Sequence, residues 1–204
     1  MSQLINVTHQ ITWPEFTTKK TDPTPAPGAV VPAAYTFPMI NTQGFGLEGI
    51  PGSKPPKAKL KDTIVVSVSL GPASWVENWV FDLPQAKQDD LLNHEQGHFS
   101  TGALLARDFY YELLKLRQKE YSSPAESTLD FNSLKTARDA AFTGIIKKYD
   151  DDTKHGTVAA QQARWDGFFS AAATQPRSPA ETAQDGTMLK VRLVDLLKMF
   201  GVTI

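Results

Sequence analysis

The sequence predicts an α+β fold, because strand-like segments lie in the first third of the chain and long helical patterns fill the rest. Residues 62–70 alternate β-branched and polar side chains, which is typical of a half-buried strand. Residues 84–120 repeat apolar side chains at helical spacing over many turns. We therefore expect a small N-terminal sheet, then one long helix, then further helices packed on it.

Three other segments complete the N-terminal part. Residues 4–13 alternate apolar and polar side chains, which predicts a first strand that ends at Trp13-Pro14. Residues 21–38 contain five prolines and Gly28, which argues against regular structure and favours a surface loop or flap. The apolar residues of segment 75–81 are expected to pack on the following helix; they are Trp75, Val76, Trp79, Val80 and Phe81.

The helical part contains four patterns. The first, 84–120, starts with a proline that suits a first helical turn and ends before Ser122-Ser123-Pro124. The second and third are predicted at 132–149 and 157–172. Residues 175–186 form a polar loop, and 187–200 are predicted as a last amphipathic helix. We expect one domain at 1–174, with 175–204 packed on it.

The composition limits the classes of function. The 204 residues carry a formal net charge of −1, which gives no argument for binding nucleic acid or an anionic membrane surface. No apolar run approaches the roughly 18 residues of a membrane-spanning helix, and the first residues do not form a signal peptide. The chain has no cysteine, so any metal site has to use His, Asp and Glu. Compartment and oligomeric state stay open.

The most informative segment is His94-Glu95-Gln96-Gly97-His98, which has the H-E-x-x-H pattern. Residues four apart lie on the same face of a helix, so both imidazoles can bind one metal ion. Glu95 is rotated by about 100° around the helix from His94 and can reach a water on that metal. Two nitrogen ligands with an adjacent base form the core of a zinc hydrolase site. The alternative is a solvated helix face that carries two histidines by chance.

Zinc in a hydrolase normally has a third protein ligand, which has to come from a segment that folds back onto this helix. Glu112 lies about 21 Å along the axis from His98 and cannot reach. The extended zincin pattern is absent, because Thr101 and Leu104 occupy its further positions. We predict His155 as the third ligand, since zinc readily takes imidazole. The alternatives are Asp150, Asp152 and Glu126.

Three further predictions about possible site residues follow from residue type and spacing. Tyr149 is a candidate to stabilise an oxyanion. Asp151 lies four residues before His155 and is a candidate to orient its imidazole if the helix runs that far. His9 lies on the polar phase of the first strand and is not expected to bind metal.

Five blocks spread over most of residues 10–166 carry a resemblance to a known family. They are Ile11-Thr12-Trp13-Pro14-Glu15-Phe16, Ser74-Trp75-Val76, Leu92-Asn93-His94-Glu95-Gln96-Gly97-His98-Phe99, Tyr149-Asp150-Asp151-Asp152-Thr153-Lys154-His155-Gly156 and Gln162-Ala163-Arg164-Trp165. The chain resembles a bacterial domain-of-unknown-function family described as zinc-dependent proteases. The resemblance implies a zincin-like fold and peptide hydrolysis, with His94, Glu95 and His98 carried over. Residues 175–204 fall outside it, and the chain lacks the export signal that members often carry.

The resulting hypothesis is a zinc-dependent metallopeptidase acting on a peptide or protein. Zinc is expected at His94, His98 and His155, with Glu95 as the base that takes a proton from the zinc-bound water. The site is expected in a cleft between the long helix and the sheet, with the strand Val65–Leu70 as an edge for an extended substrate. Two alternatives remain: a non-catalytic, zinc-stabilised interaction domain, and a zinc amidase acting on cell-wall peptides.

Overall fold

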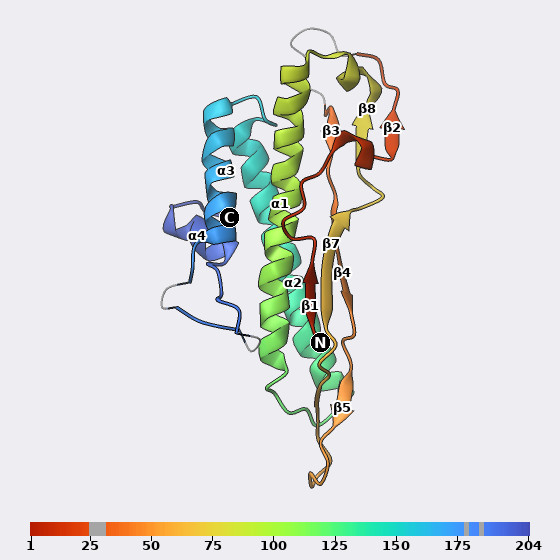
Figure 1. The fold of residues 1–204 in the computed structure, drawn as a ribbon, viewed down its shortest axis with the longest axis vertical. Coiled ribbons are helices and arrows are strands. Elements are labelled where there is room, and N and C mark those ends of the chain that lie inside the picture. The colour runs from red at the N-terminus through yellow and green to blue at the C-terminus, as the bar shows by residue number, and fades with distance from the viewer. Residues whose placement is uncertain (25–31, 178–179, 184–185) are drawn as a thin grey trace.

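The computed structural model describes residues 1–24, 32–177, 180–183 and 186–204. It confirms the α+β class: strands lie along one side of a long helix, α1 (Gln85–Leu116), and α3 and α4 lie along the other (Figure 1). The remaining helices are α2 (Pro124–Thr153), α3 (Ala159–Thr174) and α4 (Leu193–Met199). Because α1 contacts β4, β7, α2, α3 and α4, residues on this helix can meet side chains from every part of the fold.

The described strands form three small sheets. The first has the order β1-β7-β4, with β1 (Gln3–Ile5) parallel and β4 (Pro38–Gln43) antiparallel to β7 (Val65–Leu70). The second has the order β2-β8-β3, with β2 (Thr18–Lys20) parallel and β3 (Ala34–Tyr35) antiparallel to β8 (Trp75–Glu77). The third pairs β5 (Leu47–Gly49) with β6 (Ala58–Leu60). The position of β3 at the outside of its sheet matters for the site.

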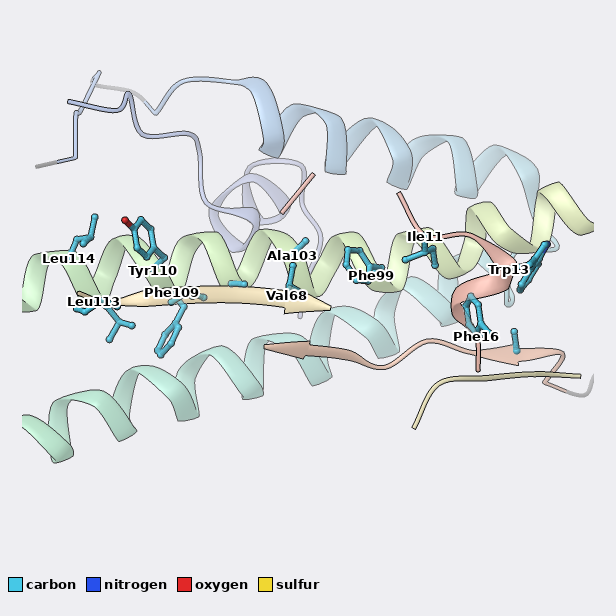
Figure 2. Packing of buried hydrophobic residues seen from close by; sticks show 14 of the residues in the cluster. Ile11, Trp13, Phe16, Val68, Phe99, Ala103, Phe109, Tyr110, Leu113 and Leu114 are labelled. Atoms are coloured by element: carbon cyan, nitrogen blue, oxygen red, sulfur yellow. The ribbon is translucent and has the colours of Figure 1, made fainter. Parts of the chain in front are cut away.

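Two hydrophobic clusters hold α1 between the layers. The first joins the sheet to α1: Val68 of β7 lies beside Ala103 and Phe99 of α1 (Figure 2), and Val66 belongs to the same cluster. The second joins α1 to α2, α3 and α4; its largest fully buried side chains are Tyr149 and Trp165. Burying a large apolar side chain contributes about 1.5–3 kcal/mol, so the two clusters fix α1 firmly.

Several N-terminal predictions need correction. The predicted strand 4–13 is a strand only as far as Ile5, because Asn6 has a positive φ of 65° and turns the chain. Residues Trp13–Glu15 instead form a 3₁₀ turn with a capping box between Thr12 and Glu15. The segment 21–38 is not wholly irregular, because it contains β3 and the first residue of β4; its residues 25–31 lie outside the described residues. In segment 75–81, Val76 and Val80 are buried as expected, whereas Phe81 is exposed.

The helices were predicted in the right order but not with the right ends. α2 begins eight residues before the predicted 132, because Pro124 takes the first turn and the Ser123 hydroxyl accepts a hydrogen bond from the Glu126 amide. The predicted helix 187–200 is helical only from Leu193. Before it, Leu189 and Val191 are buried in extended chain that makes backbone hydrogen bonds to Gln175, Arg177 and Glu181.

The C-terminal segment packs on the same body of the protein. Arg107 of α1 donates hydrogen bonds to the carbonyls of Ala172 and Val191, at 2.6 and 2.9 Å, and to Asp108. Asp108 in turn accepts from the Leu193 amide at the start of α4. No helix within the described ranges combines the length and apolar character that a bilayer crossing requires.

Candidate metal centre

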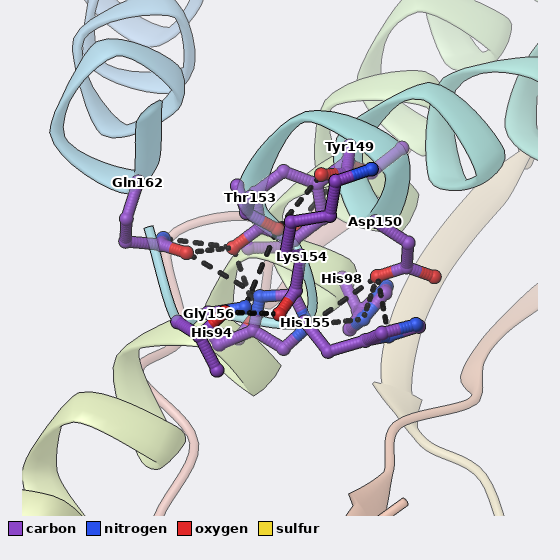
Figure 3. Close-up of polar contacts among 12 residues, drawn as sticks. His94, His98, Tyr149, Asp150, Thr153, Lys154, His155, Gly156 and Gln162 are labelled. Atoms are coloured by element: carbon purple, nitrogen blue, oxygen red, sulfur yellow. Dashed lines mark hydrogen bonds and ion pairs between the residues drawn. The ribbon is translucent and has the colours of Figure 1, made fainter. Parts of the chain in front are cut away.

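His94 and His98 lie one turn apart on α1, as the motif predicts. Both side chains are buried, and their Nε2 atoms are 3.2 Å apart (Figure 3). The helix alone places two imidazoles on one face, but the packing of α1 against α2 turns both nitrogens to the same point.

Asp150, near the C-terminal end of α2, adds a third donor atom at that point. Its Oδ1 lies 3.3 Å from Nε2 of His94 and 3.2 Å from Nε2 of His98. Two ligands of a tetrahedral zinc ion, each about 2.0–2.2 Å from the metal, stand roughly 3.3–3.6 Å apart. The three atoms are 3.2–3.3 Å apart, at or just below the lower end of this range, and a carboxylate with two imidazoles is a donor set that zinc accepts.

The charges in this cluster favour a positive charge at its centre. Burial alone would raise the pKa of Asp150, but the nearby imidazoles of His94 and His98 outweigh it and hold this pKa well below its usual range. Burial alone would lower the pKa of His98, but Asp150 and the charge of Glu95 raise it. Both pKa shifts mean that the cluster favours a positive charge beside Asp150, which a proton or a metal ion can supply.

Gln162 of α3 orients His94 through the Nδ1 side of its imidazole. Nδ1 of His94 lies 3.3 Å from Oε1 of Gln162, so a proton on Nδ1 leaves the lone pair of Nε2 free to bind a metal. The amide of Gln162 is held in turn by Asp166, at 2.9 Å. The sequence interpretation quoted Gln162 only as part of a resembling block and gave it no role. The spacing of Gln162 and Asp166 by one helical turn is the only local sequence feature that could have indicated this orienting role.

Tyr149 lies behind His94 rather than facing a substrate. Its side chain is fully buried, its ring stacks on that of His94 at 4.8 Å, and its hydroxyl donates to the His94 carbonyl at 3.0 Å. Burial raises the pKa of Tyr149 far above its ordinary value. The oxyanion role expected for Tyr149 does not suit this placement, because its hydroxyl is bonded to His94 and Gln162 and it does not line the pocket. The contacts suit a residue that positions His94.

His155 lies at the mouth of the site. Lys154, His155 and Gly156 all have positive φ, so α2 ends in a left-handed turn that brings His155 back beside Asp150. Nδ1 of His155 is 3.6 Å from Oδ1 of Asp150, and the side chain is 64% exposed. His94, Asp150 and His155 together offer ligand atoms within 4.8 Å of one another. The structure thus brings both the predicted ligand and its alternative to the site, with Asp150 nearer to the two imidazoles of α1.

The other candidates are engaged elsewhere. Asp152 accepts hydrogen bonds from Lys148 and Trp165. Asp151 pairs with Lys147 and does not orient His155, because the helix ends before that residue. Glu126 lies at the opposite end of α2, about 36 Å from Asp150 along the helix axis, where it accepts from the Ser122 amide.

Two residues that the sequence interpretation set aside also lie apart from the centre. Glu112 pairs with Lys115, farther along α1. His9 pairs with Glu15 at 2.6 Å.

Glu95 lines the pocket next to the centre. Its side chain is buried, and its Oε2 has no hydrogen-bond partner among the residues described. It lines a pocket of about 440 Å³ together with His94, His98, Asp150 and His155. A buried carboxylate oxygen without a partner is costly, so its presence beside this pocket indicates a group that is satisfied by a ligand or water.

The strand that borders this pocket is β3, not the strand expected from the sequence. β4 pairs with β7 along its whole length and β1 pairs with its first three residues, and no residue of β7 lines the pocket. β3 is paired only with β8 among the described strands, and residues 33–36 line the pocket. Because the Ala33 carbonyl accepts from Glu77 on β8, the backbone groups of Ala34 and Thr36 point to the unpaired side.

Comparisons with known proteins do not add to this picture. A scan against family models found none that matches the chain, and searches of curated proteins and of solved structures found nothing similar. The functional argument therefore depends on the geometry of the centre and its pocket.

Proposed function

We propose that this protein is a zinc-dependent metallopeptidase. The observation that carries the proposal is the triangle of donor atoms on His94, His98 and Asp150, with side lengths of 3.2–3.3 Å, beside the unpaired carboxylate of Glu95. A structural metal would need neither an adjacent base nor a pocket open to a substrate.

The three donors would hold the zinc ion, and His155 stands next to them as the alternative ligand. Zinc bound there would supply a Lewis acid that acidifies a water and polarises a carbonyl oxygen. Gln162 and Tyr149 keep His94 in the orientation that directs Nε2 to the metal position. The absence of cysteine fits a site made of nitrogen and oxygen donors.

Glu95 acts as the general base and then as the general acid. It accepts a proton from the water whose oxygen attacks the peptide carbonyl carbon. When the carbon–nitrogen bond breaks, Glu95 returns this proton to the leaving amine. Its burial beside the pocket, with Oε2 free of other partners, suits both transfers.

His155 is the group best placed to stabilise the oxyanion, a role first expected for Tyr149. Its imidazole is exposed at the pocket, and a ring N–H can donate to a developing negative charge. The main chain of an extended peptide would pair with the backbone groups of Ala34 on β3 and of Thr36 just after it, which point away from β8.

Glu95→Gln tests the proposal directly. The amide keeps the shape of the side chain but cannot accept a proton at neutral pH. We expect the variant to bind about one zinc per chain like the parent and to cleave a peptide panel about a hundred- to ten-thousand-fold more slowly. Glu112→Gln, on the same helix but outside the site, is the matched control and should retain full activity.

Three outcomes of this experiment contradict the proposal. Unchanged cleavage by zinc-loaded Glu95→Gln removes Glu95 as the base. Zinc binding by the parent without cleavage of any peptide bond favours the interaction domain, and cleavage of cell-wall peptide amides alone favours the amidase.

A further inference from the structure

The pocket beside the metal centre extends into an apolar arm. Ile146 and Phe142 lie one and two turns before Asp150 on α2, so the three residues form one stripe along the helix. Leu91 of α1 and Ala34 of β3 also line the pocket. Phe142 also lies close to Gly102 of α1, where an added Cβ would be 3.8 Å from its ring.

The charged groups that line this pocket all belong to the metal centre. They are Glu95 and Asp150, with the three histidines beside them, and no lysine or arginine lines it among the described residues. A second pocket, which shares Ala33, Leu91 and His155 with the first, differs in being lined by Lys87, Asp90, Lys154 and Asp166. The cleft around His155 thus has one apolar arm and one charged arm.

The hydroxyl of Thr36 is a second, independent sign that the apolar arm receives a ligand. Thr36 lines the pocket and is only 4% exposed, and its Oγ1 has no hydrogen-bond partner among the described residues. A buried hydroxyl left without a partner costs free energy, so a group that enters the arm and bonds to Thr36 would relieve that cost.

We propose that the arm formed by Phe142 and Ile146 binds an apolar side chain of the peptide substrate, next to the bond that is cleaved, and that Thr36 bonds to the same residue's main chain. This inference rests on the proposed function, because it places the scissile bond at the metal centre. A charged residue would lose its hydration in the arm without gaining a partner, whereas an apolar one would lose only contact with water. The reaction therefore selects peptides with an aliphatic or aromatic residue on one side of the cleaved bond.

The first test is a cleavage profile of the zinc-loaded protein on a peptide library, read by mass spectrometry. We expect apolar residues over Asp, Glu, Lys and Arg by about 10- to 200-fold in kcat/KM at one position beside the cleaved bond. Phe142→Ala should shift the preference to larger side chains. If the alanine variant does not fold, Phe142→Leu takes its place and should shift the preference in the same direction more weakly. Phe131→Ala removes an aromatic ring of the same helix that packs on Phe45 outside the pocket, and it should keep the parent profile.

The second test does not depend on turnover. Binding of two acetylated tripeptide amides, with a central Leu or a central Asp, is measured on the metal-free protein by NMR. The Leu peptide should bind at least tenfold more tightly and shift the Ile146 methyl signals, and Thr36→Val should weaken its binding several-fold.

The outcomes separate this inference from the proposed function. Cleavage without any apolar preference, or a profile unchanged in both Phe142 variants, overturns the inference and leaves the peptidase standing. Absence of cleavage, together with the expected peptide binding, overturns the peptidase and leaves the apolar arm as a peptide-binding site. Equal binding of the two peptides overturns the inference in either case.

Discussion

Gly97→Ala tests whether contact with Tyr149 keeps His94 in the position that the metal centre requires. Gly97 lies between the two histidines of the motif, and a Cβ at this position would lie 2.1 Å from the Tyr149 hydroxyl oxygen and 2.4 Å from its Cζ. Tyr149 has no free space to move into, because its ring is fully buried between His94, Trp165 and Phe169. The substitution therefore has to displace the ring or bend α1.

The magnitude follows from three contributions. Replacing a helical glycine by alanine gains up to about 1 kcal/mol from helix propensity. Overpacking a filled core costs about 1–3 kcal/mol. Loss of the hydrogen bond that the Tyr149 hydroxyl donates to the His94 carbonyl, and of the one it accepts from Nε2 of Gln162, costs about 1 kcal/mol each. We expect Gly97→Ala to lower the free energy of unfolding by roughly 2–4 kcal/mol, and zinc affinity by about ten- to a hundred-fold, because His94 loses its support.

Gly167→Ala is the matched control. This glycine is exposed on α3, and a Cβ there meets no atom within 4 Å, so the substitution should stabilise the protein by about 0.5–1 kcal/mol and leave zinc affinity unchanged. Urea unfolding followed by circular dichroism gives the stabilities, and zinc titration against a chelator gives the affinities. If Gly97→Ala is as stable as Gly167→Ala and binds zinc like the parent, the assignment of Tyr149 as a positioning residue is refuted.

Three further predictions concern the polar contacts around the site and the C-terminal segment. Arg107→Met leaves Asp108 buried without its cation and should cost about 3–5 kcal/mol in urea unfolding, with zinc affinity unchanged; a cost below about 1 kcal/mol would contradict the buried network. Gln162→Leu should weaken zinc binding about ten- to a hundred-fold in chelator competition, and an affinity equal to the parent's would remove its orienting role. In the metal-free protein, the lowered pKa of Asp150 contributes stability above about pH 4 that is lost as the pH falls, and the raised pKa of His98 contributes stability below about pH 6.5 that is lost as the pH rises. The stability difference between parent and Asp150→Asn should therefore be largest near pH 5 and smaller at pH 3 and pH 9, and a difference independent of pH would contradict the coupling.

The part of the site that could be predicted from the sequence is the part that depends on local geometry. His94 and His98 share a helical face whatever the rest of the chain does, and Glu95 follows from its position beside them. The third donor depends on how α2 ends. Lys154 is not of a type that favours a left-handed conformation, so Gly156 is the main local signal of this turn, and it does not say which of Asp150 and His155 ends nearer the imidazoles.

In the fold, too, the elements set by local sequence were predicted, and those set by long-range contacts were not. The long apolar pattern of α1 predicted its position to within a few residues at each end, because burial on most sides fixes it. The start of α2 was missed, because Ser123-Pro124 reads equally well as the end of one helix and the cap of the next. The role of β3 was missed because strand pairing is a long-range property: the two residues Ala34 and Tyr35 become an edge strand only through contact with β8.

The most direct test of the central claim is a crystal structure of the protein grown with zinc, with anomalous diffraction recorded at the zinc absorption edge. The account predicts one strong peak about 2.0–2.2 Å from Nε2 of His94, Nε2 of His98 and Oδ1 of Asp150, with Glu95 facing it across the pocket. A peak that contacts His155 but not Asp150 would contradict the assignment of the third ligand. No peak at these residues in the presence of excess zinc would contradict the metal centre itself.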